Sequence, residues 1–141
     1  MIVLDTNVIS ELMRGTPSPA VVLWVNSKAA TSLYTTSVTQ AEILHGILLL
    51  PKGKRRDAIA TAADEMFERD FASRILGFGS DAAAAYATIA ATRRRAGRPI
   101  AAFDAQIAAI ARSNDADLAT RNIADFEDCG IDLIDPWNAR R

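Results

Sequence analysis

The sequence predicts an α/β fold with a central, mostly parallel five-stranded sheet and helices on both faces. Short β-branched and aliphatic runs alternate along the chain with longer runs of helical periodicity. Proline or glycine stands at the ends of several of these runs, and half of the 141 residues are hydrophobic, many of them alanine. Alternating strands and helices are typical of parallel sheets covered by helices. The length fits a single domain over residues 1–141.

Five short runs are expected to be strands. The first is Ile2–Leu4, which ends directly before Asp5, and Thr6 and Asn7 are expected to cap the turn that follows. The other expected strands are Leu33–Thr36 and residues 74–78, 117–120 and 131–134.

Helices are expected where apolar residues recur at a spacing of three to four positions. Residues 52–56 are expected to be a basic link, and in the helix that Pro99 opens, Phe103, Ile107 and Ile110 are expected to face the core. The expected helices are residues 19–29, 40–50, 57–71, 80–96 and the segment after Pro99.

Charge and composition exclude several kinds of chemistry. The net charge of −1 gives no global support for nucleic-acid binding. A single histidine, His45, excludes an acid–base mechanism that needs two histidines, and a single cysteine, Cys129, excludes an internal disulfide. No apolar run has the length of a membrane span, and the N-terminus lacks a basic leader. A cytoplasmic protein that uses carboxylates for any hydrolysis is therefore expected.

Several acidic residues are expected to meet at one edge of the sheet, because ligands of open parallel sheets bind outside the carboxyl ends of the strands. Asp5 follows the first strand, and Glu42 lies early in the helix after the second. Asp104 lies early in the helix before the fourth strand, and Asn122 and Asp125 follow that strand. Asp104 would join the others if its helix begins at this edge.

Each acid also has a structural explanation. Asp5 could cap the turn after its strand, Glu42 has the capping-box spacing from Thr39, and Asp104 suits the first turn of a helix. Together, however, carboxylates about 4 Å apart repel by roughly 4 kcal/mol at an effective dielectric constant of 20. A bound cation would remove this repulsion, and oxygen ligands favour Mg²⁺ or Mn²⁺ over zinc.

Five segments resemble PIN-domain proteins, especially the VapC-type toxins of bacterial toxin–antitoxin pairs. They occur in the order of that family over nearly the whole chain, with less agreement between residues 50 and 95. The segments are residues 1–11, 37–42, 100–108, 119–126 and the closing Ile-Asp-Pro-Trp at 134–137.

The resemblance implies a PIN-like fold and an endoribonuclease toxin that needs Mg²⁺, with Mn²⁺ as a substitute. Asp5, Glu42 and Asp104 match the three acidic positions of the metal site in the family. Asn122 or Asp125 would take the fourth position, and Asn122 would offer a carbonyl oxygen without a charge.

Further expectations concern hydroxyl groups and partners. Thr6 and Thr120 would add hydroxyl contacts behind the metal ligands. The resemblance also implies a homodimer and a small antitoxin that covers the groove near the acids and attaches the pair to operator DNA.

Two arginines are candidates for RNA contacts. Arg94 belongs to a basic cluster at a helix end, and Arg121 follows the fourth expected strand. A phosphoacceptor receiver domain is disfavoured because no lysine follows Lys54, and a haloacid dehalogenase phosphatase because Asn7 replaces its second aspartate. The remaining alternative is a catalytically silent PIN-like module that acts only by binding a protein or RNA.

Overall fold

Strands and helices alternate along residues 1–139, which are the residues that the computed structural model describes. The strands are β1 (Ile2–Leu4), β2 (Leu33–Thr36), β3 (Ile75–Leu76), β4 (Asp117–Ala119) and β5 (Leu133–Ile134). The α-helices are α1 (Thr6–Leu12), α2 (Pro19–Asn26), α3 (Ser37–Leu48), α4 (Lys54–Glu65), α5 (Ser80–Arg95) and α6 (Ala102–Ser113). Short turns of other helix types are η1 (Ala30–Ser32), η2 (Met66–Asp70) and η3 (Ile123–Phe126).

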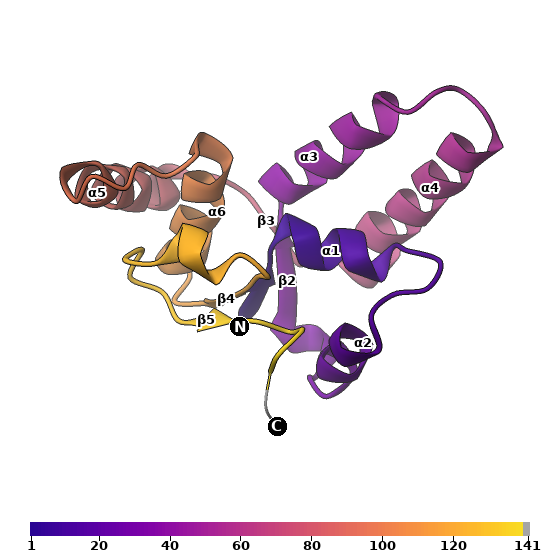
Figure 1. Ribbon diagram of the computed structural model, residues 1–141, viewed down its shortest axis with the longest axis horizontal. Coiled ribbons are helices and arrows are strands. Elements are labelled where there is room, and N and C mark those ends of the chain that lie inside the picture. The colour runs from indigo at the N-terminus through magenta and orange to yellow at the C-terminus, as the bar shows by residue number, and fades with distance from the viewer. Residues whose placement is uncertain (140–141) are drawn as a thin grey trace.

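The five strands form one sheet in the order β3-β2-β1-β4-β5, and every pair of neighbours is parallel (Figure 1). Strand β1 lies at the centre, where Ile2 pairs with Leu33 on one side and with Asp117 on the other. The chain thus leaves β1 toward β2 and later returns to its opposite side through β4. The predicted α/β class and five-stranded sheet are confirmed, and the sheet is parallel throughout.

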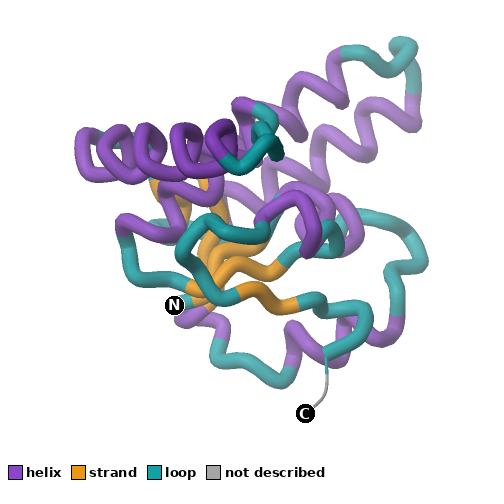
Figure 2. The backbone as a smooth tube through the Cα atoms, turned by 60° about the vertical axis from the view of Figure 1, so that its left-hand side comes forward, coloured by secondary structure: helices purple, strands orange, loops and turns teal. Residues whose placement is uncertain are grey.

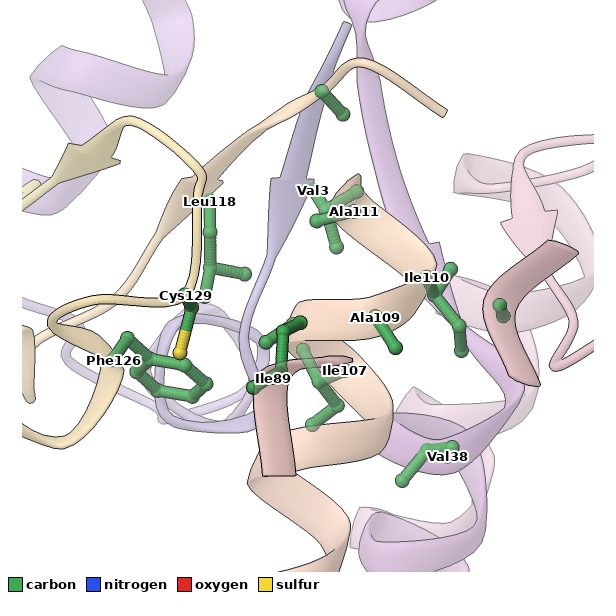
Figure 3. Packing of buried hydrophobic residues seen from close by; sticks show 13 residues of the cluster. Val3, Val38, Ile89, Ile107, Ala109, Ile110, Ala111, Leu118, Phe126 and Cys129 are labelled. Atoms are coloured by element: carbon green, nitrogen blue, oxygen red, sulfur yellow. The ribbon is translucent and has the colours of Figure 1, made fainter. Parts of the chain in front are cut away.

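Helices cover both faces of the sheet, as predicted (Figure 2). Successive residues of a strand point to opposite faces. In β1, Val3 therefore packs with α5 and α6, in a core that includes Ile89, Ile107 and Leu118 (Figure 3). Leu4 belongs to the second core, which α1, α2, α3 and α4 cover from the other side.

The segment after β1 differs from the expected turn, because it is the helix α1. Asp5 has extended backbone angles and is the N-cap of this helix, and its Oδ1 accepts a hydrogen bond of 2.8 Å from the Thr6 amide. Val8 and Ile9 bury the apolar side of α1 against the sheet. Asp5 therefore joins a central strand directly to a helix.

Helix α3 begins three residues earlier than expected. Its N-cap is Thr36, the last residue of β2, whose hydroxyl accepts a hydrogen bond of 3.0 Å from the Thr39 amide. The capping-box explanation of Glu42 is therefore wrong, because Thr39 lies inside the helix rather than at its N-cap position.

Two other helix starts and one core assignment also differ from expectation. Helix α4 begins at Lys54, inside the expected basic link, and α6 begins at Ala102 rather than at Pro99. Phe103 is 52% exposed, whereas Ile107 and Ile110 are fully buried. Phe103 lies in the first turn of α6, before the helix reaches the sheet, and therefore does not contribute to the core.

Candidate active site

A cavity of about 550 Å³ lies at the carboxyl ends of β1, β2 and β4. Because β2 and β4 lie on opposite sides of β1, the strand order reverses at β1, and the carboxyl ends of these strands form the topological switch point at which parallel sheets bind ligands. The cavity is lined by Asp5, Thr6, Asn7, Ser10, Glu11, Arg14, Glu42, Asp104, Arg121, Asn122 and Trp137. The structure thus places Asp5, Glu42 and Asp104, from three separate segments, around one space.

Asp5 is the most buried of these acids, with 4% of its surface exposed. Its Oδ2 accepts a hydrogen bond of 2.8 Å from the Thr120 hydroxyl, which belongs to the residue directly after β4. Burial raises the pKa of Asp5 to about 6, and the charges of Asp104 and Glu42 act in the same direction. The hydrogen bonds from Thr120 and Thr6 oppose this shift. Asp5 is therefore an acid whose charge would gain from a nearby cation.

Glu42 is oriented by a chain of hydroxyl groups from α1 and α3. The Thr6 hydroxyl donates to Glu42 Oε1 at 2.8 Å, and the hydroxyl oxygens of Thr6 and Thr39 are 3.0 Å apart. Since the single hydroxyl hydrogen of Thr6 goes to Glu42, Thr39 must donate to Thr6. Thr39 is fully buried, so this chain anchors Glu42 to the interior of the protein.

Asp104 lies in the first turn of α6 and is partly buried. Burial is the largest cause that raises its pKa, followed by the charges of Asp125 and Glu42, while Arg93 has the opposite effect. The helix dipole also favours an acid at this position. The position of Asp104 is therefore consistent both with a structural role at the start of α6 and with a place in the acidic site.

The donor set around the cavity fits a hard divalent cation. Its ionisable ligands are carboxylates, and the charges of Asp5, Glu42 and Asp104 act on one another. Within residues 1–139, no three His, Cys, Asp or Glu side chains form a ready-made metal cluster. Mg²⁺ tolerates such spacing, because it keeps several waters and needs only one or two carboxylates.

The two candidates for a fourth position differ in placement. Asn122 lines the cavity, and its backbone amide donates to the Thr120 hydroxyl at 3.1 Å. Asp125 lies one turn further in η3 and is not among the lining residues, although its charge raises the pKa of Asp104. Only Asn122 therefore faces the shared space.

Of the two arginines considered for RNA contacts, Arg121 lines the cavity and Arg94 does not. Arg94 is exposed in the last turn of α5. Five further residues of the cavity wall were not expected there: Asn7, Ser10, Glu11, Arg14 and Trp137. Glu11 and Arg14 come into view only once residues 6–12 are known to be helical.

Glu11 is a buried acid with a structural role. It accepts a hydrogen bond of 2.9 Å from the Ser18 amide and pairs with Arg14 at 3.3 Å. The Ser18 amide is the main cause that lowers the pKa of Glu11. Glu11 therefore closes the loop between α1 and α2 and is already supplied with partners.

Three relatives match almost the entire chain. Plasmid stability protein StbB of Pseudomonas syringae pv. tomato is 42% identical over 139 residues, covering 99% of this chain and 100% of the relative. VapC ribonuclease Y4jK of Sinorhizobium fredii is 39% identical, with coverage of 97% and 98%. Toxin FitB of Neisseria gonorrhoeae is 37% identical, with coverage of 98% and 99%.

A solved structure and a family model agree with these relatives. The structure of FitAB bound to an IR36 DNA fragment is similar to this chain with a TM-score of 0.92. That chain is 36% identical, and the match covers 100% of this chain and 99% of the other. The model of the PIN domain matches residues 2–130. The chain therefore belongs to the PIN domain family, and its fold is that of the FitB and VapC toxins.

Proposed function

We propose that this protein is a metal-dependent endoribonuclease and the toxin of a toxin–antitoxin pair. The central observation is that Asp5, Glu42 and Asp104, which are distant in sequence, line one cavity of about 550 Å³. A VapC ribonuclease and the toxin FitB are full-length relatives, which supports the same function.

In this proposal, Asp5, Asp104 and Glu42 hold Mg²⁺, and Mn²⁺ can replace it. When bound, the ion supplies an activated water and neutralises negative charge that develops on the phosphodiester. Thr120 and the Thr6 amide fix the carboxylate of Asp5, and the Thr6 hydroxyl fixes that of Glu42. Hydrolysis leaves a 3′-hydroxyl and a 5′-phosphate.

We propose that the protein forms a homodimer and binds a small antitoxin, which covers the acidic cavity and attaches the complex to operator DNA. The similar FitAB structure is bound to DNA, which supports this assembly. No helix within residues 1–139 is both long and apolar enough to span a membrane. We place the RNA substrate, and hence the protein, in the cytoplasm.

The test compares Asp5→Asn and Asp104→Asn with the wild type on structured and single-stranded RNA, with Mg²⁺, with Mn²⁺ and with EDTA. Loss of a group that hydrogen-bonds a metal ligand reduces metal affinity or activity about 10- to 100-fold. Loss of the ligand itself should therefore reduce cleavage by more than about 100-fold. Asp81→Asn is the control, because Asp81 also lies in the first turn of a helix, α5, but outside the cavity.

Cleavage by either site variant at the wild-type rate would contradict these roles. A wild-type protein that binds RNA but cleaves none of it with either metal would support the silent binding module instead.

A further inference from the structure

Arg121 and Trp137 form a cation–π pair on the wall of the cavity. The guanidinium carbon of Arg121 lies 4.9 Å from the centre of the Trp137 ring, within the range of a cation–π contact. The Arg121 backbone amide donates to Asn7 Oδ1 at 3.2 Å. Arg121 is therefore fixed at its backbone by α1 and at its side chain by the segment after β5.

The charge of this arginine is free for a ligand. Within residues 1–139, Arg121 makes no ion pair, whereas Arg14 on the same wall is paired with Glu11. Glu11 also accepts the Ser18 amide, so its carboxylate is already occupied. The charge of Arg121 is the smallest cause that lowers the pKa of Glu11, but no carboxylate of residues 1–139 lies within ion-pair distance of its guanidinium.

A cation at this position offsets the repulsion between the acids of the cavity and an RNA backbone. Asp5, Glu42 and Asp104 repel a polyanion, and the net charge of −1 provides no general attraction to RNA. A guanidinium presents several N–H donors in one plane and can bind two phosphate oxygens at once. Cation–π contact with Trp137 holds that plane in place, which reduces the entropy lost on binding.

We propose that Arg121, positioned by Trp137, binds an RNA phosphodiester adjacent to the one that lies at the three acids. This inference rests on the proposed ribonuclease function and adds a subsite for the substrate backbone. Trp137 is a positioning residue, because it acts through Arg121. The subsite recognises phosphate rather than base identity, so it contributes affinity without sequence preference.

The test measures the binding of a fluorescein-labelled single-stranded oligouridylate to full-length protein at several salt concentrations. All proteins contain Asp5→Asn, so that the probe stays intact. Arg121→Ala should weaken binding about tenfold and reduce the slope of log K against log salt by about 0.7 to 1, the value for one phosphate contact.

Lys28→Ala is a matched control. The Lys28 ammonium lies 5.6 Å from the centre of the Trp24 ring, and neither residue lines the cavity. This variant therefore loses one positive charge and one cation–π contact elsewhere, and should keep the affinity and slope of the Asp5→Asn parent. If Arg121→Ala behaves like Lys28→Ala, the subsite is overturned.

Two more variants test the role of Trp137. Trp137→Leu should weaken binding by less than Arg121→Ala does, and the double variant should bind as Arg121→Ala alone. Trp137→Phe, which keeps an aromatic ring, should restore much of the affinity. Additive effects of the two substitutions would instead show that Trp137 contacts RNA by itself.

The outcomes separate this inference from the proposed function. If Asp104→Asn abolishes cleavage while Arg121→Ala binds RNA normally, the ribonuclease function stands and the phosphate subsite fails. An Arg121→Ala variant that loses only its protein partner would assign the pair to a protein interface and overturn the subsite. A parent protein that does not bind the probe would overturn it as well.

Discussion

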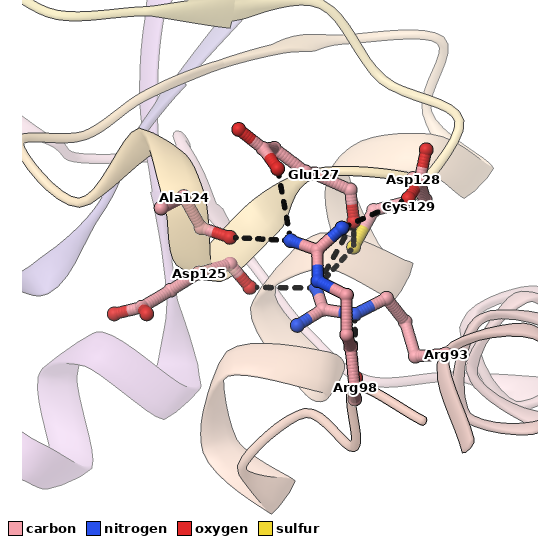
Figure 4. Close-up of polar contacts among 7 residues, drawn as sticks. All are labelled: Arg93, Arg98, Ala124, Asp125, Glu127, Asp128 and Cys129. Atoms are coloured by element: carbon pink, nitrogen blue, oxygen red, sulfur yellow. Dashed lines mark hydrogen bonds and ion pairs between the residues drawn. The ribbon is translucent and has the colours of Figure 1, made fainter. Parts of the chain in front are cut away.

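The acids that follow β1 and β2 are held in place by hydroxyl groups, whereas the loop that follows β4 is held by arginines at its backbone. Thr120 and Thr6 donate directly to the carboxylates of Asp5 and Glu42, at 2.8 Å in both cases. Residues 124–129, in contrast, contact Arg93 and Arg98 through three peptide carbonyls as well as through side chains (Figure 4). All the hydrogen bonds of Arg93 to oxygen atoms are to carbonyls, whereas Arg98 also pairs with two carboxylates.

Arg93 is the main support of this loop and is only 5% exposed. It donates to the carbonyl oxygens of Asp125 at 2.8 Å, Glu127 at 3.0 Å and Arg98 at 2.7 Å. The carboxylate of Asp125 points away from both arginines (Figure 4). The path of the loop is thus fixed. The carboxylates of Glu127 and Asp128 pair with Arg98 at 2.8 Å and 3.2 Å, whereas that of Asp125 contacts neither arginine.

The difference indicates separate roles for the two regions, the acids held by hydroxyl groups and the loop that follows β4. Hydroxyl donors fix the orientation of a carboxylate, which a metal ligand requires. Backbone anchoring fixes only the chain path and tolerates either an amide or an acid at the side chain. Asn122 in place of an acid is therefore compatible with its position in the loop that follows β4.

The largest expected effect is on stability, for Arg93→Met. The substitution removes three partly buried hydrogen bonds from a charged donor to carbonyl oxygens, so it should lower the free energy of unfolding by about 3 to 5 kcal/mol. Arg94→Met, at the exposed neighbouring position, should change it by less than about 0.5 kcal/mol. Urea denaturation measures both, and equal effects would show that the loop does not depend on Arg93.

The sequence predicts some parts of this site and not others. Ile2–Leu4 and Asp5 were identifiable because a buried strand and the acid after it are local features. Helix α1 was missed, since a helix of seven residues gives little periodicity and its N-cap is the acid itself. The predicted strands and acids therefore located the cavity but not the wall that α1 contributes.

Contacts between distant residues could not be predicted. Thr6 and Glu42 are separated by 36 positions, and no local pattern links them. Three consecutive arginines at a helix end are typical of a solvated surface, and only the tertiary fold buries Arg93 while Arg94 stays exposed. The pairing of Arg121 with Trp137 likewise depends on where the segment after β5 passes.

The second expected effect is a pH dependence caused by Asp5. Its pKa of about 6 in the folded protein exceeds the ordinary value of 3.8, so the folded state binds the proton more tightly. This stabilisation is complete below pH 4 and is lost as the pH rises to about 6. In EDTA it should amount to about 3 kcal/mol, at 1.36 kcal/mol for each pH unit between the two values.

The Asp5 contribution is obtained by difference, because two other acids also contribute to the pH dependence. The raised pKa of Asp104 produces a slope of the same sign, and the lowered pKa of Glu11 produces the opposite slope. Unfolding free energies of the wild type and Asp5→Asn are compared from pH 4 to pH 7 in EDTA. Saturating Mg²⁺ should abolish the loss, since the ion binds the ionised form. Parallel curves for the two proteins in EDTA would show that burial does not raise the pKa of Asp5.

The third expected effect tests the role of the hydroxyl groups that orient the acids. Thr6→Val keeps the shape of the side chain and removes the donor to Glu42, so Mg²⁺ affinity should fall about tenfold. Stability should fall by only about 1 kcal/mol, the reverse of the pattern for Arg93→Met. Thr61→Val is the control, because the Thr61 hydroxyl donates only to the Asp57 carbonyl on an exposed face. Calorimetric titration with Mg²⁺ would contradict the comparison if the two variants bound equally.

The smallest expected effect concerns the loop that follows β4. Asp125→Asn removes a charge that raises the pKa of Asp104 but leaves the carbonyl that Arg93 binds. Because Asp125 lies outside the cavity lining, its charge should assist Mg²⁺ only at a distance, and affinity should fall about two- to fourfold. The reduction should fade at high salt, since exposed charges are screened. A salt-independent loss of about 100-fold would instead make Asp125 a direct ligand, and both regions would then bind the metal ion.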